Sequence, residues 1–240
     1  MMLPVDDLAF EASFFGRPVW RLKDAAAAED VVMEAREQGV GLISCRLPAG
    51  ETGGRGLARH GFRLVETLVT LTCPVAGQKM PDGVSPAMRS EEEALSCAEI
   101  GAKTFKHDRF HADSQVDNAI ADALKSAWVA NAVKDRADCV LLYRDEVQEI
   151  RGFNACLFRP SDKMAIIDLI GIDPECQRQG IGSRLLQGMH AHYHGRADEI
   201  RLGTQLANKQ SLDFYRRNGF QELFRQETWH WVPNPNQGNL

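Results

Sequence analysis

The chain has 240 residues, of which 44% are hydrophobic and 25% charged, a composition typical of a soluble globular protein with one or two domains. A formal net charge of −5 argues against a general nucleic-acid binder, because such proteins carry a basic surplus that neutralises phosphates. The six cysteines form no closely spaced pair, which argues against a zinc site or a disulfide framework and indicates a reducing, cytoplasmic location. No segment has the length and apolar character of a membrane span or the pattern of a signal peptide, so we expect no membrane partner.

The segment GQKMPDGVSPAM at 77–88 contains two prolines and two glycines and predicts a linker. We therefore expect a small N-terminal α/β domain over residues 1–76 and a larger domain over 89–233. The composition of residues 234–240 is that of a flexible tail.

The part of the chain after the linker alternates between helical and extended patterns. In chain order we expect helices at 90–105 and 116–133, strands at 139–143, 150–158 and 165–172, a helix after Gly182, a strand at 199–206, a helix at 208–219 and an extended stretch at 220–232. This order predicts an α/β or α+β fold whose mixed sheet contains a parallel crossover between residues 165 and 206.

Two segments of the chain resemble each other. RHGFRLVETLVTLTCPV (59–75) and RRNGFQELFRQETWHWVP (216–233) share a basic residue, a Gly-Phe pair, a strand pattern with Glu-Thr and a proline near the end. Either two similar turn-and-strand units occur by coincidence, or the first part is a degenerate half-copy of the second that adds strands to a common sheet.

The stretch CQRQGIGSRLL (176–186) connects a predicted strand to a predicted helix and contains Gly180 and Gly182. Glycines at a helix N-terminus leave backbone N–H groups free, and these groups together with the helix dipole can bind phosphate. The same residues can also form a plain tight turn. A P-loop is excluded because its lysine motif is missing, and a dinucleotide-binding turn is disfavoured because Leu185 stands where the third glycine belongs.

The longer stretch IDLIGIDPECQRQGIGSRLLQGM resembles the acetyl-CoA-binding motif of the GNAT superfamily of N-acetyltransferases, whose signature is Q/R-x-x-G-x-G/A. LGTQLANKQSLDFYRRNGF is similar to the strand, Asn-containing turn and helix that follow this motif in the family. The resemblance covers roughly residues 90–232. It implies the GNAT acyl-CoA N-acyltransferase fold, a mixed central sheet flanked by helices, here with a small degenerate GNAT-like N-terminal domain.

Three further segments, at 12–22, 60–73 and 104–113, look like the bacterial group of dTDP-fucosamine acetyltransferases. That resemblance implies that acetyl-CoA is the co-substrate and that the acceptor is a small-molecule amine, in particular a dTDP-linked amino sugar. Other small amines, such as an antibiotic, a polyamine or an amino acid, remain alternatives. So does a non-catalytic module that binds acyl-CoA. A homodimer is compatible with the sequence.

The resemblance also implies which residues hold acetyl-CoA. Residues 178–183 would bind the pyrophosphate through their backbone N–H groups, and the N–H near Ile170 would face the thioester oxygen. The expected acetyl-CoA residues are Ile170, Gly171, Ile172, Gln177, Arg178, Gln179, Gly180, Ile181, Gly182, Ser183, Asn208 and Tyr215.

Tyr215 is the expected general acid that protonates the leaving thiolate, with a core aromatic as its structural alternative. Asp168 interrupts an apolar strand and either handles the acceptor amine or makes a structural hydrogen bond. The expected acceptor-binding residues are Arg109, Phe110 and His111, with a solvated surface loop as the alternative, and Asn154, for which a structural role is favoured. We expect no metal, because the histidines at 190, 192 and 194 lie two apart and would point to different sides of a helix.

Overall fold

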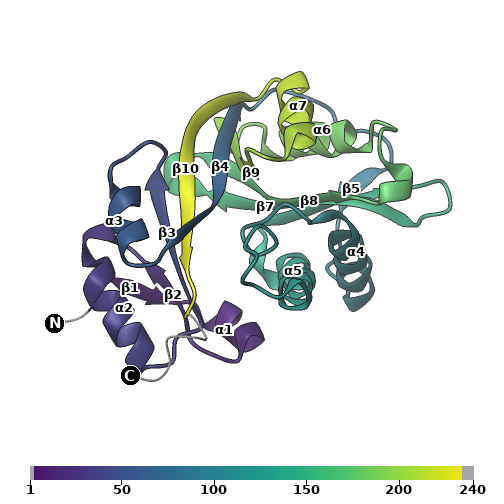
Figure 1. Ribbon diagram of the computed structural model, residues 1–240. Coiled ribbons are helices and arrows are strands. Elements are labelled where there is room, and N and C mark those ends of the chain that lie inside the picture. The colour runs from purple at the N-terminus through teal and green to yellow at the C-terminus, as the bar shows by residue number, and fades with distance from the viewer. Residues whose placement is uncertain (1–2, 234–240) are drawn as a thin grey trace.

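The computed structural model describes residues 3–233, so the expected flexible tail at 234–240 lies outside the described residues (Figure 1). The first elements are β1 (Val5–Asp7), α1 (Ala9–Phe15), β2 (Val19–Leu22), α2 (Ala28–Glu37), β3 (Leu42–Pro48), α3 (Gly53–Arg59) and β4 (Arg63–Pro74). They are followed by β5 (Val84–Pro86), α4 (Glu91–Thr104), α5 (Asn118–Asn131), β6 (Cys139–Arg144), β7 (Ile150–Arg159), β8 (Met164–Ile172), α6 (Ile181–Tyr193), β9 (Glu199–Gln205), α7 (Lys209–Arg217) and β10 (Gln221–Trp231).

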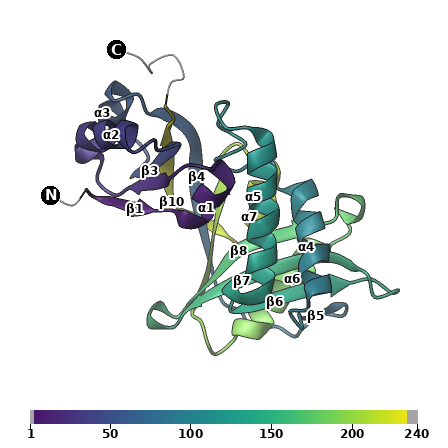
Figure 2. The ribbon, with the colours of Figure 1, turned by 90° about the horizontal axis from the view of Figure 1, so that it is seen from below.

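All ten strands form one mixed sheet that curves between the two parts of the chain (Figures 1 and 2). In the larger part, α6 and α7 cover one face of the sheet and α4 and α5 cover the other (Figure 1). Each of these layers has its own apolar core, and the fully buried Leu185 and Phe153 lie at their centres. The predicted mixed α/β sheet flanked by helices is therefore confirmed.

The predicted helices and strands after residue 88 are all present, and α4 begins at a full capping box between Ser90 and Glu93. One detail of the predicted linker is wrong, because Val84–Pro86 form the edge strand β5 that pairs with β6. The buried side chain of Val84 accounts for this pairing, and a proline is tolerated there because an edge strand has one unpaired side.

The sheet is symmetrical in its order, which is β1-β2-β3-β10-β4-β9-β8-β7-β6-β5. On one side β2 is parallel to β3, and β3 pairs in antiparallel fashion with β10. On the other side β8 is parallel to β9, and β9 pairs in antiparallel fashion with β4. The two halves of the chain thus exchange their last strands: β4, the last strand of the first half, pairs with β9 of the second, and β10 pairs with β3 of the first. In Figure 1 the yellow β10 runs between the blue β3 and β4.

The two segments with similar sequences adopt the same turn. Gly61 and Gly219 have φ angles of 85° and 86°, a left-handed conformation that glycine adopts without strain. The following residue in each segment, Phe62 or Phe220, is 2% exposed, and each donates its N–H to a carbonyl five residues earlier at 3.1 Å. This matching geometry favours a degenerate half-copy over coincidence.

A buried ionic cluster ties β4 and β10 to the segment that precedes α5. The carboxylate of Asp113 accepts a hydrogen bond from Arg63 Nη2 at 2.8 Å and contacts His230 Nδ1 at 3.0 Å. Burial opposes the charge on Asp113, but hydrogen bonds from His230, the Gln115 backbone and Arg63 outweigh it and lower the pKa of Asp113 to about 2. Burial lowers the pKa of His230, so Arg63 is the cation that balances Asp113 near neutral pH.

We predict that Asp113→Asn lowers the free energy of unfolding at pH 7 by about 3 kcal/mol, because it removes the buried carboxylate that Arg63 and His230 both contact. The ionised Asp113 stabilises the wild type fully above the unfolded pKa near 3.8, and this stabilisation is lost as the pH falls toward 2. Urea denaturation at pH 7, 4 and 2.5 measures both effects.

The matched control is Asp6→Asn, which removes an exposed ion pair with Lys23 and should change stability little. Equal losses in the two variants would contradict the special role of the buried cluster.

Candidate active site

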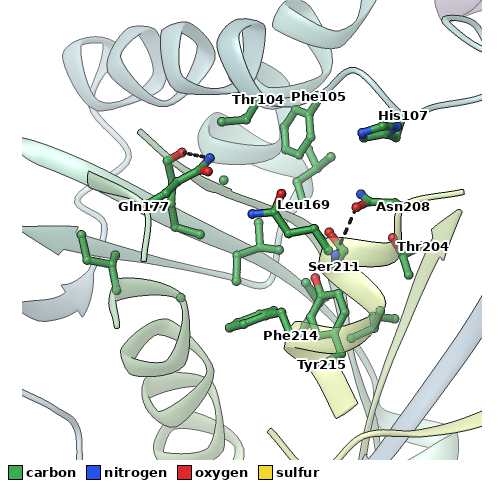
Figure 3. Close-up of a pocket in the computed structure, with 18 of the residues that line it drawn as sticks. Thr104, Phe105, His107, Leu169, Gln177, Thr204, Asn208, Ser211, Phe214 and Tyr215 are labelled. Atoms are coloured by element: carbon green, nitrogen blue, oxygen red, sulfur yellow. Dashed lines mark hydrogen bonds between the residues drawn. The ribbon is translucent and has the colours of Figure 1, made fainter. Parts of the chain in front are cut away.

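The site begins where two parallel strands separate. β8 and β9 pair from Met164 opposite Glu199 to Ile167 opposite Leu202, and their pairing ends there. A cavity of about 710 Å³ is lined by the separated ends of both strands, by the turn before α6, by α7 and by residues 104–108 (Figure 3). The separation leaves backbone groups of β8 available to a ligand.

The hydrogen bonds of β8 with β7 identify which groups these are. The N–H of Asp173 donates to the carbonyl of Arg151 at 2.9 Å, so this pair is hydrogen-bonded. Hydrogen-bonded and non-hydrogen-bonded pairs alternate in antiparallel strands. Gly171 therefore bonds to β7, whereas Ile170 and Ile172 direct their N–H and C=O groups toward the cavity. Gln177 Nε2 donates to the carbonyl of Ile172 at 3.4 Å, as this orientation requires.

Asp168 lies at the point where the strands separate, in a β-bulge of β8. Ala155 pairs with Leu169 and Cys156 with Ile167, so Asp168 is an extra residue with no partner on β7. Its carboxylate binds Arg136 in the helical turn Ala132–Arg136 that follows α5. Asp168 does line the cavity, but its ion pair with Arg136 favours the structural alternative over a free base.

The turn before α6 directs backbone N–H groups at the cavity. Arg178 and Gly180 have φ angles of 61° and 80°, and Gly180 is the N-cap of α6 without a side-chain cap. The first helical hydrogen bond is made by the N–H of Arg184, so the N–H groups of residues 181–183 have no partner within the helix. Such a group of N–H donors at the positive end of a helix dipole is an anion-binding site.

Gly182 has a second reason to be glycine. A Cβ atom at this position would lie 2.9 Å from Cζ of Phe214, so a larger residue would push α6 and α7 apart.

Of the twelve expected acetyl-CoA residues, eleven line the cavity, and the exception is Gln179, whose side chain donates to the Glu175 carbonyl.

Helix α7 contributes Asn208 and Tyr215. Oδ1 of Asn208 caps the helix by accepting from the N–H of Ser211 at 3.1 Å, which leaves the amide Nδ2 to donate elsewhere. Tyr215 is 6% exposed and its ring packs against Phe220, and burial raises its pKa well above the usual value. In Figure 3 its hydroxyl is directed to the side of the cavity where Leu169 and Ser211 lie.

The segment 104–113 divides into a part that lines the cavity and a part that is buried elsewhere. Lys106, His107 and Asp108 line the cavity, whereas the expected acceptor-binding residues Arg109 and Phe110 do not.

Arg109 is buried and donates to Glu11 Oε1 of α1 at 3.2 Å, and burial lowers its pKa to about 10. Phe110 is 1% exposed and packs against Phe15 and His230. Both residues anchor the segment to other parts of the chain, so their positions offer no contact with an acceptor in the cavity.

The other two expected acceptor-binding residues also lie outside the cavity lining. His111 is held between Asp108 at 2.6 Å and Asp122 at 3.0 Å. Asn154 is fully buried in the sheet, where Nδ2 contacts Met189 Sδ at 3.7 Å. The structural role favoured for Asn154 therefore agrees with its position, whereas the solvated-loop alternative for Arg109, Phe110 and His111 is wrong, because their side chains are buried against other parts of the protein.

The cavity is also lined by residues that the sequence did not predict. Lys125 of α5 lines the cavity, with Nζ 4.5 Å from the ring centroid of Trp128 and 5.6 Å from that of Phe105. The available signal was a lone lysine within the apolar stretch ADALKSAWVANAV, where helical periodicity assigns most positions to the core.

Within residues 3–233 no three histidine, cysteine or acidic side chains gather in a group that could hold a metal ion. No helix in that range is long and apolar enough to cross a membrane.

Comparisons with known proteins agree with this geometry. Residues 135–222 match the family model of the acetyltransferase (GNAT) domain. A search of curated proteins by sequence finds no match, and nothing in the comparisons supports a dTDP-fucosamine acetyltransferase in particular.

Several solved structures share the fold at low sequence identity. A GCN5-related N-acetyltransferase from Sphaerobacter thermophilus is 17% identical, with 96% of this chain and 76% of that chain covered and a TM-score of 0.62. A tandem GNAT protein from the clavulanic acid biosynthesis pathway is 13% identical, with 92% and 77% covered and a TM-score of 0.59. A glucosamine N-acetyltransferase region of a fungal multi-domain β-N-acetylglucosaminidase is 14% identical, with 90% and 30% covered and a TM-score of 0.58. The chain therefore has the GNAT fold, and residues 135–222 in its C-terminal part are similar to the acetyltransferase (GNAT) domain.

Proposed function

We propose that the protein transfers the acetyl group of acetyl-CoA directly to the amine of a small molecule, with a dTDP-linked amino sugar as the favoured acceptor. One observation carries this proposal. A single cavity is bordered by three features: the unpartnered N–H groups in the first turn of α6, the open edge of β8 and the phenol ring of Tyr215.

The residues present fit acetyl-CoA. The N–H groups of residues 181–183 suit a pyrophosphate, and Arg178 adds a positive charge beside them. The N–H and C=O groups of Ile170 and the N–H of Ile172 suit the amide groups of a pantetheine arm, which would take the place of a neighbouring strand. The amide Nδ2 of Asn208 can donate to the same arm.

Acetyl-CoA, when bound, supplies an acetyl group activated as a thioester. The N–H of Ile170 donates a hydrogen bond to the thioester oxygen and stabilises the negative charge that develops there, an effect worth about 3 kcal/mol. The neutral acceptor amine forms the new amide bond as the carbon–sulfur bond breaks, and its proton passes to water. Tyr215 donates its phenolic proton to the departing sulfur and then regains a proton from the solvent, which has taken up the proton of the amine. Because burial raises the pKa of Tyr215, its hydroxyl remains protonated at neutral pH.

Two features support an amino sugar as the acceptor. The end of the cavity near residues 104–108 is polar, as a hydroxyl-rich acceptor requires. A structure with the same fold is described as a glucosamine N-acetyltransferase region.

The experiment that tests the proposal is a panel of amines with acetyl-CoA, monitored by release of the free thiol. The panel contains nucleotide amino sugars, simple amino sugars, polyamines, amino acids and an aminoglycoside. Turnover with none of them, despite acetyl-CoA binding, would favour a non-catalytic module.

We predict that Tyr215→Phe lowers kcat about 10²- to 10³-fold while the affinity for acetyl-CoA stays within a factor of two or three, because only the proton donor is lost. Steady-state kinetics and calorimetric titration with acetyl-CoA measure the two quantities. Tyr193→Phe is the matched control, since Tyr193 is also buried but bonds Asp138 and does not line the cavity. An unchanged kcat in Tyr215→Phe would remove Tyr215 from the mechanism.

We predict that Gly180→Ala weakens acetyl-CoA binding about tenfold, which corresponds to about 1.4 kcal/mol. Gly180 has a positive φ, and an added methyl group would meet no protein atom within 4 Å. Because Gly180 lines the cavity, the methyl group would instead occupy space that the proposed pyrophosphate needs. Gly195→Ala is the control, because Gly195 has a φ of 76° and equally free surroundings but lies outside the cavity lining. Both variants should lose about 1 kcal/mol of stability from backbone strain. Equal acetyl-CoA affinities would contradict the assigned cradle.

A further inference from the structure

The two ends of the cavity differ in their charged groups. In Figure 3, Gln177 and His107 lie on opposite sides of Leu169 and Tyr215. The Gln177 side belongs to the turn before α6, where acetyl-CoA is proposed to bind. We call the other side the acceptor end, and it is lined by Lys106, His107, Asp108, Lys125 and Asp168.

Most charges at the acceptor end are already paired within the protein. Lys106 Nζ binds Asp122 at 2.7 Å, and Asp168 binds Arg136. Asp108 accepts from His111 and from the N–H of Phe110. These groups therefore have little capacity left for a ligand.

Lys125 is the exception. Among residues 3–233, its Nζ makes no hydrogen bond and no ion pair, although it is partly buried and borders the cavity. It lies against the face of Trp128 at 4.5 Å and near Phe105, contacts that stabilise a cation but accept none of its three N–H bonds. Burial lowers the pKa of Lys125, and the negative charges of Asp108 and Asp168 oppose this effect. The ammonium group thus lies against aromatic rings, and its N–H donors are unused.

We propose that Lys125 binds an anionic group of the acceptor, so that preferred acceptors are amines that also carry a phosphate or a carboxylate. This inference rests on the proposed function and narrows its substrate class. A phosphate or carboxylate oxygen supplies the hydrogen-bond acceptor that the ammonium lacks, in a charge-assisted bond. A polyamine, by contrast, brings only positive charge to an end of the cavity where Lys125 is the unpaired charge among the described residues, so it is disfavoured by like-charge repulsion.

Matched acceptors test the inference. We expect the wild type to acetylate glucosamine 6-phosphate or glucosamine 1-phosphate with a kcat/KM about 10- to 100-fold above that of glucosamine. Muramic acid tests a carboxylate in place of a phosphate. Lys125→Met should abolish the preference by lowering kcat/KM only for the charged acceptors, and Lys125→Arg should restore much of it. Lys134→Met is the control, because Lys134 pairs with Glu91 and does not line the cavity.

A binding measurement separates this inference from the proposed function. With CoA held at saturation to fill the cradle before α6, inorganic pyrophosphate is titrated and the change in tryptophan fluorescence is recorded. Trp128 contacts Lys125, so we expect a saturable change in the wild type that is lost in Lys125→Met and in Trp128→Phe.

If no amine is turned over but this signal depends on Lys125, the proposed function fails and the anion site stands. If turnover occurs, yet the ratio of charged to uncharged acceptors is the same in the wild type and Lys125→Met, the inference is overturned. The inference is likewise overturned if the fluorescence signal does not depend on Lys125 and the ratio of charged to uncharged acceptors is equal in the wild type and Lys125→Met.

Discussion

The separation of β8 from β9 beyond Ile167 and Leu202 is the constraint on which the cavity depends. Two adjacent parallel strands normally satisfy each other's backbone groups, and unpaired groups away from water are costly. The bulge at Asp168 accompanies the separation, and the ion pair of Asp168 with Arg136 holds the bulge against the helical turn after α5. Beyond it, Ile170 and Ile172 present a strand edge that no other strand covers. Under the proposed function, a ligand with an extended, amide-bearing arm would complete that edge, so the feature that opens the sheet would also bind the ligand.

The exchange of β4 and β10 determines how the acceptor end is built. Because β10 crosses to β3, His230 reaches the segment before α5 and binds Asp113 there, while Arg63 of β4 binds the same carboxylate. Glu11 of α1 binds Arg109 in the same segment. The N-terminal half therefore touches the cavity indirectly, by holding residues 109–113 in place so that residues 104–108 form its wall. In the matching turn of the N-terminal half, Leu57 stands at the position that Tyr215 occupies in the C-terminal half.

Local patterns in the sequence predict the elements after residue 88 and the cradle before α6, because capping, periodicity and glycine placement act over a few residues. They do not predict the roles of Arg109 and Phe110, whose partners Glu11, Phe15 and His230 are about 100 residues away along the chain. A polar sequence such as KHDRFHAD looks solvent-exposed until those partners are known. For Lys125 the sequence misleads in the other direction. Its apolar neighbours predict a helix packed in the core, and they give no sign of the cavity that the helix borders. Asp168 stands out in the sequence as a polar residue in an apolar strand. Its place in a bulge could not be predicted, because a bulge depends on the register of two strands.

The exchanged strands also have a consequence for how the chain folds. Arg46 of β3 binds Thr228 of β10, 182 positions later, so the edge of β3 has no partner until nearly the whole chain is available. Contacts of such long range slow folding and leave an unpaired strand exposed in the meantime. The N-terminal half is thus the first part synthesised and among the last to be completed. Its edge is the place where misassembly with a second nascent chain would begin, with the β10 of one molecule pairing with the β3 of another.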